Sequence, residues 1–302
     1  MKKISVLLII SALFLGIPCQ AGIISTYKAK VEQNKILKSD ENSIRIILNQ
    51  QTEHANKHDA LALESFYSND FINSDGFNKE IYFKLIKDTF ESYPDITYKT
   101  YIHNIQVADN HATVYVTETA VATTKEEIGE FETVGELLSA SNCIYHFEKH
   151  GTVWLIESEQ VLEETSTLKY GEARYINIEL NSPKLVGSDK FYTSTLKVDA
   201  PKGTTVVASI SKENIVYPQV KAEEAFRRLP SDNIIERVFK SNSSNVNEYN
   251  VASIGITHAE NYDEKHIKVY LNGLAFIMTR VNVIPENKSA KIEEDKKDGE
   301  ST

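Results

Sequence analysis

The sequence contains little cysteine, tryptophan or methionine, and it has fewer basic than acidic residues. Its 302 residues include two Cys, one Trp and two Met, and Lys plus Arg number 33 against 43 Asp plus Glu. The net charge of -10 disfavours binding to nucleic acid or anionic lipid through bulk electrostatics. Charged residues (25%) and hydrophobic residues (41%) are at ordinary globular levels, and the length predicts two domains.

The sequence also lacks the common catalytic signatures. It has no Cys-x-x-Cys pair, no glycine-rich phosphate loop and no ordered Ser-His-Asp set. His54 and His58 stand four residues apart on an expected helix, but the glutamate of the zinc-protease pattern is missing. We therefore predict no metal site and no cofactor.

The N-terminus has the features of a secretory signal peptide. Two lysines precede an apolar stretch over residues 6–17, and small residues lead to Ala21, after which we place cleavage. The stretch is shorter than the roughly 20 apolar residues that span a bilayer, which disfavours an N-terminal membrane anchor. Lipoprotein anchoring through Cys19 is disfavoured because Pro18 stands directly before it. We expect an exported protein, periplasmic or extracellular, with no stable membrane insertion after signal removal.

The ends of the mature chain are expected to lie outside the two domains. Residues 22–38 are predicted to be a linker or helix, and residues 286–302 a disordered charged tail, because they have little apolar surface to bury. Loss of the signal peptide leaves Cys143 as the single cysteine, so no intramolecular disulfide can form.

Residues 39–165 predict an α+β domain. Ser39, Asp59 and Asn78 are suitable N-caps for three successive helices with apolar residues at three- and four-residue spacing. After Pro94 the period changes to two, and residues 111–117 alternate as a strand with one buried face. Three helices followed by an antiparallel meander predict helices packed on one face of a sheet.

This domain resembles the nuclear transport factor 2-like superfamily, in its SnoaL-like branch. The matching motifs are KHDA at 57–60, YSNDF at 67–71, YHFE at 145–148 and WLIESEQ at 154–160, in the expected order and spacing. The resemblance covers residues 44–165 and implies a curved antiparallel sheet wrapped with helices around a cone-shaped pocket. Members of the superfamily include isomerases, dehydratases, epoxide hydrolases and domains without chemistry, so the fold does not decide the function.

Residues 172–285 predict a second, all-β domain. Short alternating runs recur along it, and Asn272-Gly273 is the strongest two-residue hairpin signal in the sequence. Six or seven strands at this spacing predict a β-sandwich of immunoglobulin-like type. The Cys and Trp of true immunoglobulin domains are absent from this half, and we identify no family for it.

Two carboxylates are candidates for a catalytic base. Alternation places Glu118 on the buried face of its strand, where desolvation would raise the pKa of the carboxyl; alternatively, the strand reaches the sheet rim there and Glu118 meets water. Asp75 lies where relatives pass the pocket mouth, but Asp before Gly is also ordinary turn chemistry. The resemblance further implies aromatic and polar residues lining the pocket, for which the candidates are Tyr67, Tyr82, Tyr101, His103 and Trp154.

The outward face of the first domain's sheet is a candidate interface. Thr113, Tyr115 and Thr117 point away from the helices and form a β-prone, half-polar surface that suits a partner sheet. We predict a homodimer through this face, the alternative being a solvated surface.

Three functions remain open from the sequence. The leading hypothesis is an exported, non-catalytic binding protein with a pocket for a small apolar ligand or partner segment and a β-sandwich interaction domain. The second is a cofactor-independent isomerase or hydratase of a small hydrophobic substrate. The third is an envelope assembly protein whose pocket is filled by its own side chains. Two polar groups converging in an open cavity would favour the enzyme.

Overall fold

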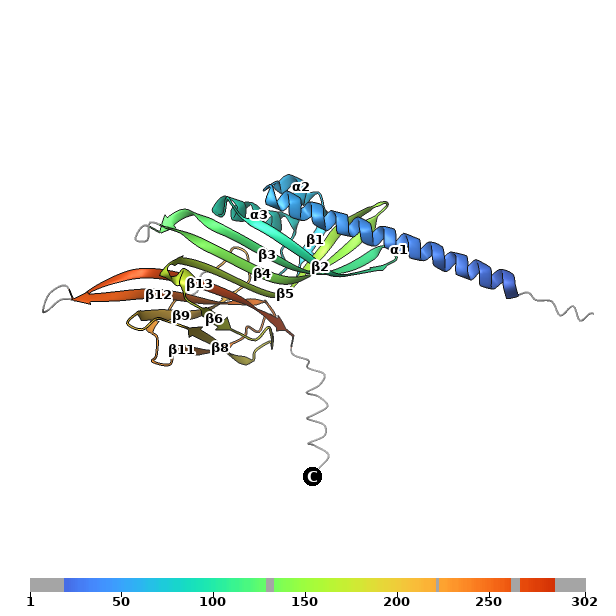
Figure 1. The fold of residues 1–302 in the computed structure, drawn as a ribbon. Coiled ribbons are helices and arrows are strands. Elements are labelled where there is room, and N and C mark those ends of the chain that lie inside the picture. The colour runs from blue at the N-terminus through green and yellow to red at the C-terminus, as the bar shows by residue number, and fades with distance from the viewer. Residues whose placement is uncertain (1–18, 129–132, 221–222, 262–266, 286–302) are drawn as a thin grey trace, which may run out of the picture.

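Three helices lie on one face of a large sheet in the computed structural model, which describes residues 19–128, 133–220, 223–261 and 267–285 (Figure 1). Two of the three predicted N-caps are present, because the side chain of Asp59 accepts a hydrogen bond from the backbone N–H of Ala62 and that of Asn78 from Ile81. The predicted cap at Ser39 is wrong, because the first helix begins at Cys19 and Ser39 lies inside it. Residues 22–38, expected to be a linker or helix, are part of the first helix. The helices are α1 (Cys19–Asn56), α2 (Ala60–Glu64) and α3 (Lys79–Ser92).

The sheet of the first half is built from long strands. One short strand lies parallel to the last of them, and the other four form an antiparallel meander as predicted. These strands extend well beyond the predicted runs. They are β1 (Tyr67–Asn73), β2 (Thr97–Ala108), β3 (His111–Ile128), β4 (Thr133–His150) and β5 (Val153–Gly171).

The second half contributes strands to two layers. One group continues the large sheet, and β6, β8 and β11 form a separate three-stranded sheet below it (Figure 1). The elements are a 3-10 turn (Glu172–Tyr175), β6 (Ile178–Asn181), β7 (Leu185–Gly187), β8 (Phe191–Val198), β9 (Thr205–Asn214), β10 (Arg227–Arg228), β11 (Ile234–Lys240), β12 (Glu248–Asn261) and β13 (Ile267–Ile284).

A single sheet joins the two halves. Its strand order is β10-β9-β12-β13-β5-β4-β3-β2, so β5 has β4 on one side and β13 on the other. Thr165 pairs with Ala140 of β4 and with Thr279 of β13, and Leu168 is paired on both sides in the same way. The boundary expected between residues 165 and 172 therefore falls inside a doubly paired strand, and we correct it: no loop separates the halves there.

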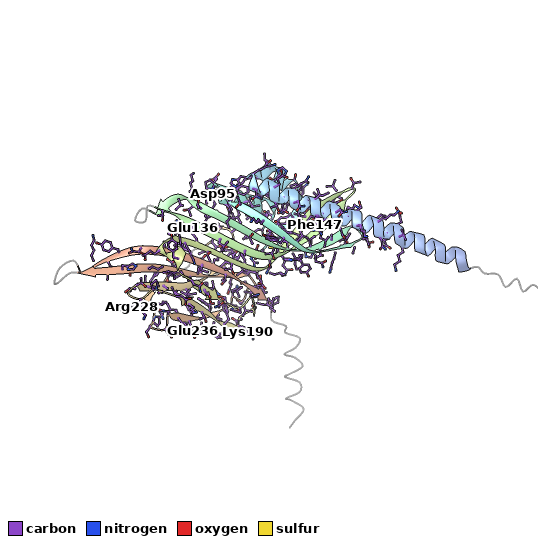
Figure 2. All side chains as sticks on the ribbon, in the orientation of Figure 1. Asp95, Glu136, Phe147, Lys190, Arg228 and Glu236 are labelled. Carbon is purple, nitrogen blue, oxygen red and sulfur yellow. The ribbon has the colours of Figure 1, made fainter. Side chains whose placement is uncertain are left out.

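The second half forms a sandwich that shares one layer with the first half. Its core lies between the three-stranded sheet and the continuation of the large sheet, and is filled by Leu196, Ile210, Ile254, Ile277 and similar residues. Figure 2 shows this packing from the side, with Lys190 and Glu236 in the lower layer and Phe147 in the first half. The two layers agree with the expected sandwich in outline. Likeness to immunoglobulin domains stays a prediction.

The predicted hairpin at Asn272-Gly273 is wrong. Both residues lie inside β13, and Gly273 pairs with Ile256 of β12 and Gly171 of β5. A Cβ atom on Gly273 would lie 2.6 Å from the backbone nitrogen of Ala173. The glycine therefore permits a close approach of the 3-10 turn, and no reversal of the chain occurs there.

The core of the first half lies between the helices and the sheet. Ile44 and Leu48 of α1 pack with Val114, Tyr145 and Trp154 of the strands, and all five are buried. No helix in the described part of the chain is both long and apolar enough to cross a membrane. The predicted signal peptide lies mostly, and the charged tail entirely, outside the described residues.

Candidate functional site

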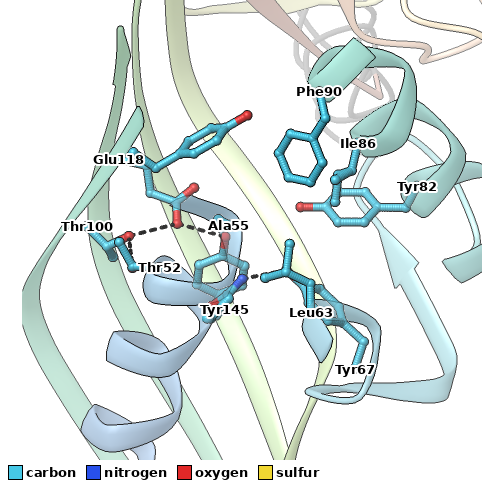
Figure 3. Close-up of a pocket in the computed structure, with 12 residues that line it drawn as sticks. Thr52, Ala55, Leu63, Tyr67, Tyr82, Ile86, Phe90, Thr100, Glu118 and Tyr145 are labelled. Atoms are coloured by element: carbon cyan, nitrogen blue, oxygen red, sulfur yellow. Dashed lines mark hydrogen bonds between the residues drawn. The ribbon is translucent and has the colours of Figure 1, made fainter. Parts of the chain in front are cut away.

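A cavity of about 120 Å³ lies between the three helices and the sheet of the first half (Figure 3). Aromatic rings and aliphatic side chains form most of its wall, and a carboxylate and several hydroxyl groups interrupt them. The cavity is lined by Gln51, Thr52, Ala55, Leu63, Tyr67, Tyr82, Ile86, Phe90, Tyr98, Thr100, Glu118 and Tyr145.

Glu118 supplies the carboxylate of the cavity. It lies on β3 and faces the same side as Val116, as alternation predicts, so its side chain points towards the helices. Its Oε1 accepts a hydrogen bond from the hydroxyl of Tyr145 at 3.0 Å and a longer one from Thr100 at 3.5 Å. Burial raises the pKa of Glu118, and the two hydroxyl donors lower it in part.

Two tyrosines form the opposite wall. The hydroxyl of Tyr67 accepts a hydrogen bond from Nε2 of Gln51 at 2.6 Å, and the Tyr67 ring contacts that of Tyr82, with the centroids 5.6 Å apart. In Figure 3 the hydroxyl of Tyr82 points into the cavity, towards the wall that carries Glu118. Burial raises the pKa of both tyrosines well above the usual value, so both remain protonated donors at neutral pH.

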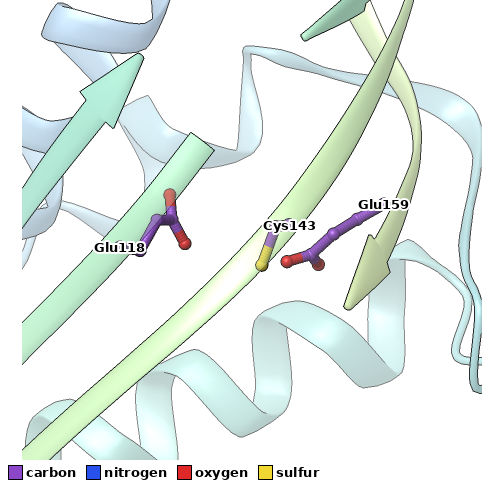
Figure 4. A group of neighbouring side chains, drawn as sticks. All are labelled: Glu118, Cys143 and Glu159. Carbon is purple, nitrogen blue, oxygen red and sulfur yellow. The ribbon is translucent and has the colours of Figure 1, made fainter. Parts of the chain in front are cut away.

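A second carboxyl group, Glu159 on β5, lies behind this wall. It is buried, with 6% of its surface exposed, and Tyr82 is near enough to lower the pKa of its carboxyl in part. Carboxylate oxygens of Glu118 and Glu159 and the sulfur of Cys143 lie within 4.8 Å of one another, on three adjacent strands (Figure 4). Burial, followed by repulsion from Glu118, raises the pKa of Glu159 to about 8.

No basic side chain among the described residues that line the cavity neutralises the charge of Glu118 and Glu159. None of the described residues that line the cavity is Lys, Arg or His. Two carboxylates this close and this dry cannot both ionise near neutral pH at low cost, so one of them holds a proton. A carboxylate and a carboxylic acid therefore lie side by side, with Glu118 in the cavity lining and Glu159 outside it.

Cys143 lies between the two carboxyl groups. Burial, with both glutamates adding to it, raises the pKa of the thiol far above its usual range, so the sulfur is protonated and a poor nucleophile. Glu118, Cys143 and Glu159 are the types of side chain that bind metals, as are Glu148, His150 and Glu157 near the β4–β5 turn. In the latter group, His150 is already hydrogen-bonded to Glu157 at 2.8 Å.

The structure brings only some of the predicted pocket residues together. Tyr67, Tyr82 and Glu118 line one cavity. Tyr101 is 53% exposed, and His103 is exposed and hydrogen-bonded to Thr117 at 2.7 Å, because both lie on the opposite face of the sheet. We therefore correct the expectation that these two residues belong to the pocket.

Trp154 is also outside the cavity. It is packed in the core, and its indole N–H donates to Asp40 of α1 at 3.1 Å. These contacts explain the aromatic residue by packing alone. The prediction that Trp154 lines the pocket is therefore wrong. Tyr115 of the predicted interface is 39% exposed, while Thr113 and Thr117 are hydrogen-bonded to neighbours on the same face.

Asp75, the second candidate base, is engaged elsewhere. Its carboxylate accepts two hydrogen bonds from the guanidinium of Arg280, one of them from Nη1 at 3.0 Å and the other from Nη2. It also accepts a hydrogen bond from Nδ2 of Asn247 at 2.8 Å. The side chains of Asp75 and Arg280 are 5% and 1% exposed. This pair joins the β1–α3 turn to β13, and Asp75 does not reach the cavity.

Sequence reasoning missed Glu159 because of a bulge in β5. Trp154 and Ile156 alternate inwards, so regular alternation predicts that Ser158 follows them and that Glu159 points out. The register between β4 and β5 shifts at this point, and Glu159 takes the inward position instead. Tyr145 could have been found, since it alternates with Cys143 and Phe147 on a face that is buried throughout.

Comparison with known proteins gives a likeness of fold over the first half alone. No family model and no curated protein matches the sequence. Among solved structures, a "Putative Scytalone Dehydratase" from Novosphingobium aromaticivorans aligns with 43% of this chain and 86% of its own, at 12% identity and a TM-score of 0.37.

Two further structures match the same part of the chain. A "putative dehydratase from the NTF2-like family" of Streptomyces avermitilis covers 41% of this chain and 96% of its own, at 12% identity and a TM-score of 0.34. Hexachlorocyclohexane dehydrochlorinase LinA-type3 from Novosphingobium barchaimii covers 41% and 85%, at 14% identity and the same TM-score. These structures, too, align with only about two-fifths of the chain.

Proposed function

We propose that the cavity is the active site of a cofactor-independent enzyme that moves protons on a small, largely apolar substrate, as an isomerase or hydratase does. The observation that carries this proposal is the opposition of Glu118 and the hydroxyl of Tyr82 across one cavity. Sequence reasoning ranked a non-catalytic binding protein first. The convergence of a base and a hydrogen-bond donor is the feature that favours the enzyme.

The two walls supply complementary chemistry. Glu118 is a carboxylate with a raised pKa, and a base is most effective when its pKa lies near the working pH. Tyr82 and Tyr67 are neutral donors whose hydroxyl groups can stabilise an oxygen that gains negative charge as the proton leaves. Apolar residues such as Leu63 and Phe90 exclude water, which strengthens both interactions.

The size of the cavity limits the substrate. Its volume of about 120 Å³ is close to that of cavities of roughly 150 Å³ that bind benzene. A single six-membered ring with one carbonyl or hydroxyl group fits this space. Because the wall opposite the base donates hydrogen bonds, we place the oxygen of the substrate beside the tyrosines and an acidic C–H bond beside Glu118.

The remaining functional expectations belong to the same proposal. We propose that the protein is exported, that it needs no cofactor for this chemistry, and that two copies associate through the face with Thr113, Tyr115 and Thr117. In this proposal the second half, with its sandwich, supplies a separate contact surface of the immunoglobulin-like kind that its strand pattern predicts.

The proposal is tested by the simplest reaction that the site can catalyse. Purified protein in D₂O is incubated with cyclohexanone or cyclohex-2-enone, and deuterium incorporation next to the carbonyl is followed by NMR. Replacing Glu118→Gln removes the base and should lower the rate at least about 100-fold. Glu163→Gln, on β5 and ion-paired with Lys184 at 2.6 Å, is the matched control and should leave the rate unchanged.

A binding protein would give a different result. If both ketones bind, by isothermal calorimetry, and neither exchanges faster than in buffer, the catalytic proposal is wrong and the cavity serves binding. Equal exchange rates for the wild type and the Glu118→Gln variant would also exclude Glu118 as the base.

A further inference from the structure

A cluster of metal-binding side chains lies near the turn between β4 and β5. It consists of Glu148 and His150 of β4 and Glu157 of β5, and one ligand atom of each lies within 4.8 Å of the other two. Lys149 is hydrogen-bonded to Asp40 of α1, so its side chain points towards the helices. Alternation along β4 therefore places Glu148 and His150 on the opposite face of the sheet, away from the helices (Figure 1). We call these three residues the hairpin cluster.

A β-bulge puts Glu157 into the hairpin cluster. Its two neighbours along the chain, Ile156 and Ser158, pair with consecutive residues of β4, so Glu157 is the residue that this ladder skips. Because Ile156 is buried against the helices, Glu157 faces away from them and towards His150. The bulge that turns Glu159 inward thus also brings Glu157 to the outer face of the sheet.

The carboxylate of Glu157 is held in position from two sides. Its Oε1 is hydrogen-bonded to Nε2 of His150 at 2.8 Å, and its Oε2 accepts a hydrogen bond from the hydroxyl of Ser68 at 2.8 Å. Ser68 lies on β1 and is 4% exposed, so this second hydrogen bond comes from the interior of the protein. Carboxylates that bind metals are typically fixed in this way, because a hydrogen bond to one oxygen aims the other at the ion.

The chemistry of the hairpin cluster fits a divalent transition-metal ion. Two carboxylates neutralise the double charge of the ion, and the imidazole nitrogen favours Zn²⁺ over Ca²⁺ and Mg²⁺, which prefer oxygen ligands alone. Two ligand atoms on one tetrahedral zinc ion lie roughly 3.3 Å apart, given bonds of about 2.0–2.2 Å. The three ligand atoms lie within 4.8 Å of one another, so small side-chain rotations are enough to reach this separation.

A further histidine lies beside the hairpin cluster on the neighbouring strand. His111 of β3 pairs with Glu148, so the two side chains share the outer face, with their Cβ atoms roughly 5 Å apart. The next histidine along this face, His146, is hydrogen-bonded to Thr113 at 3.3 Å. Strand pairing thus gathers two carboxylates and two imidazoles at one place. The sequence predicts no metal site because this pairing cannot be read along the chain.

We propose that Glu148, His150 and Glu157 bind one Zn²⁺ ion, with His111 as the fourth ligand and Ser68 orienting the carboxylate of Glu157. The ion takes the place of the proton that His150 and Glu157 share in their hydrogen bond. It links β4 to β5 across their turn. The hairpin cluster and the cavity lie on opposite faces of the sheet, so this inference does not depend on the proposed function.

Zinc titration of the purified protein, without a histidine tag and after removal of metals with EDTA, tests the proposal. Isothermal calorimetry should show one Zn²⁺ per chain. Glu148→Gln, His150→Ala and Glu157→Gln should each weaken binding at least about 10-fold, and Ser68→Ala should weaken it about 10-fold because the carboxylate loses its orientation. Saturating zinc should raise the midpoint of thermal unfolding of the wild type by about 3 °C or more, and that of His150→Ala by much less.

An exposed histidine–glutamate pair elsewhere in the molecule provides the matched control. His258 and Glu172 are 2.7 Å apart, with side chains that are 37% and 47% exposed, and neither belongs to a metal-binding group among the described residues. His258→Ala should therefore leave the affinity for zinc unchanged. An equal loss of affinity in His258→Ala and His150→Ala would show that zinc binds to surface histidines in general, and the proposal would be overturned.

Three other outcomes would also contradict the proposal. A wild type that binds no zinc up to millimolar concentration has no such site. Loss of zinc binding in Glu159→Gln, with normal binding in His150→Ala, would place the ion with Glu118 and Cys143 on the other face of the sheet. Tighter binding of Ca²⁺ than of Zn²⁺ would show that the protein holds a cation that prefers oxygen ligands, and the assignment to zinc would be wrong.

Discussion

Glu159 links the free energy of unfolding to pH through a single side chain. Its pKa is about 8 in the folded protein and about 4.5 when exposed to water, so the folded state binds the proton more tightly. Between these two values the folded state holds a proton that the unfolded state has released. Stability must therefore be highest below pH 4.5, as far as this group is concerned, and must fall as the pH rises to about 8.

Replacing Glu159→Gln should remove this dependence. We expect the wild type to lose stability, on the order of a few kcal/mol, between pH 5 and pH 9, and the variant to lose much less. Urea unfolding at several pH values, followed by circular dichroism, measures the difference. Parallel curves for the two proteins would mean that Glu159 titrates near its ordinary value in the folded state.

Strand β5 shows how an element can serve two parts of the molecule. Its first half carries Glu159 to the inward, helix-covered face of the sheet, because a bulge shifts the register against β4. Its second half, from Thr165 onwards, pairs with β13 and so continues the large sheet into the second half of the chain. A substitution that removes the bulge would alter both the position of Glu159 and the pairing of β5 with β13.

The sequence predicts those features of the elements that depend on neighbours along the chain. The caps at Asp59 and Asn78 and the inward direction of Glu118 follow from local patterns, and the structure contains all three. The bulge that turns Glu159 inward depends on pairing with another strand, which no short run of residues encodes. The same is true of the length of β5.

A substitution at Gly273 tests how tightly β13 packs against the 3-10 turn between the two halves. The substitution Gly273→Ala places a Cβ atom 2.6 Å from the backbone nitrogen of Ala173, which cannot move without displacing the 3-10 turn. We expect a loss of about 1–3 kcal/mol of stability in thermal or urea unfolding. At Gly255, in the neighbouring strand, a Cβ atom would meet only the side chains of Val207 and Leu271, at 3.1 and 3.3 Å. Gly255→Ala should therefore cost less, and the reverse order would refute this account of the hairpin signal.

The two halves of the molecule should unfold together. They share a sheet, and the buried pair of Asp75 and Arg280 connects a turn of the first half to β13. Replacing Asp75→Ala leaves the guanidinium buried without its main partner, which should cost about 3–5 kcal/mol. Differential scanning calorimetry should show one transition for the wild type and one, at a lower temperature, for the variant.

An exposed ion pair provides the control for this experiment. Lys84 and Asp88 on α3 are 2.7 Å apart, and each is 54% exposed, so Asp88→Ala should change the transition little. Two separate transitions in the wild type would show that the halves are independent in spite of the common sheet. A negligible effect of Asp75→Ala would show that the buried pair does not hold the halves together.

The place of β13 in the sheet also sets the order in which the protein can be completed during synthesis. It is the last strand described, yet it lies between β5 and β12, near the middle of the sheet. Until residue 284 has left the ribosome, the end of β5 beyond Thr165 has an unpaired edge, and so has β12. Unpaired edges attract other chains, so the nascent protein must be kept apart from its copies until its final strand arrives. A chain truncated before β13 would lose the strand that connects its two halves. It would also expose two unpaired strand edges, on β5 and β12, that can pair with other copies.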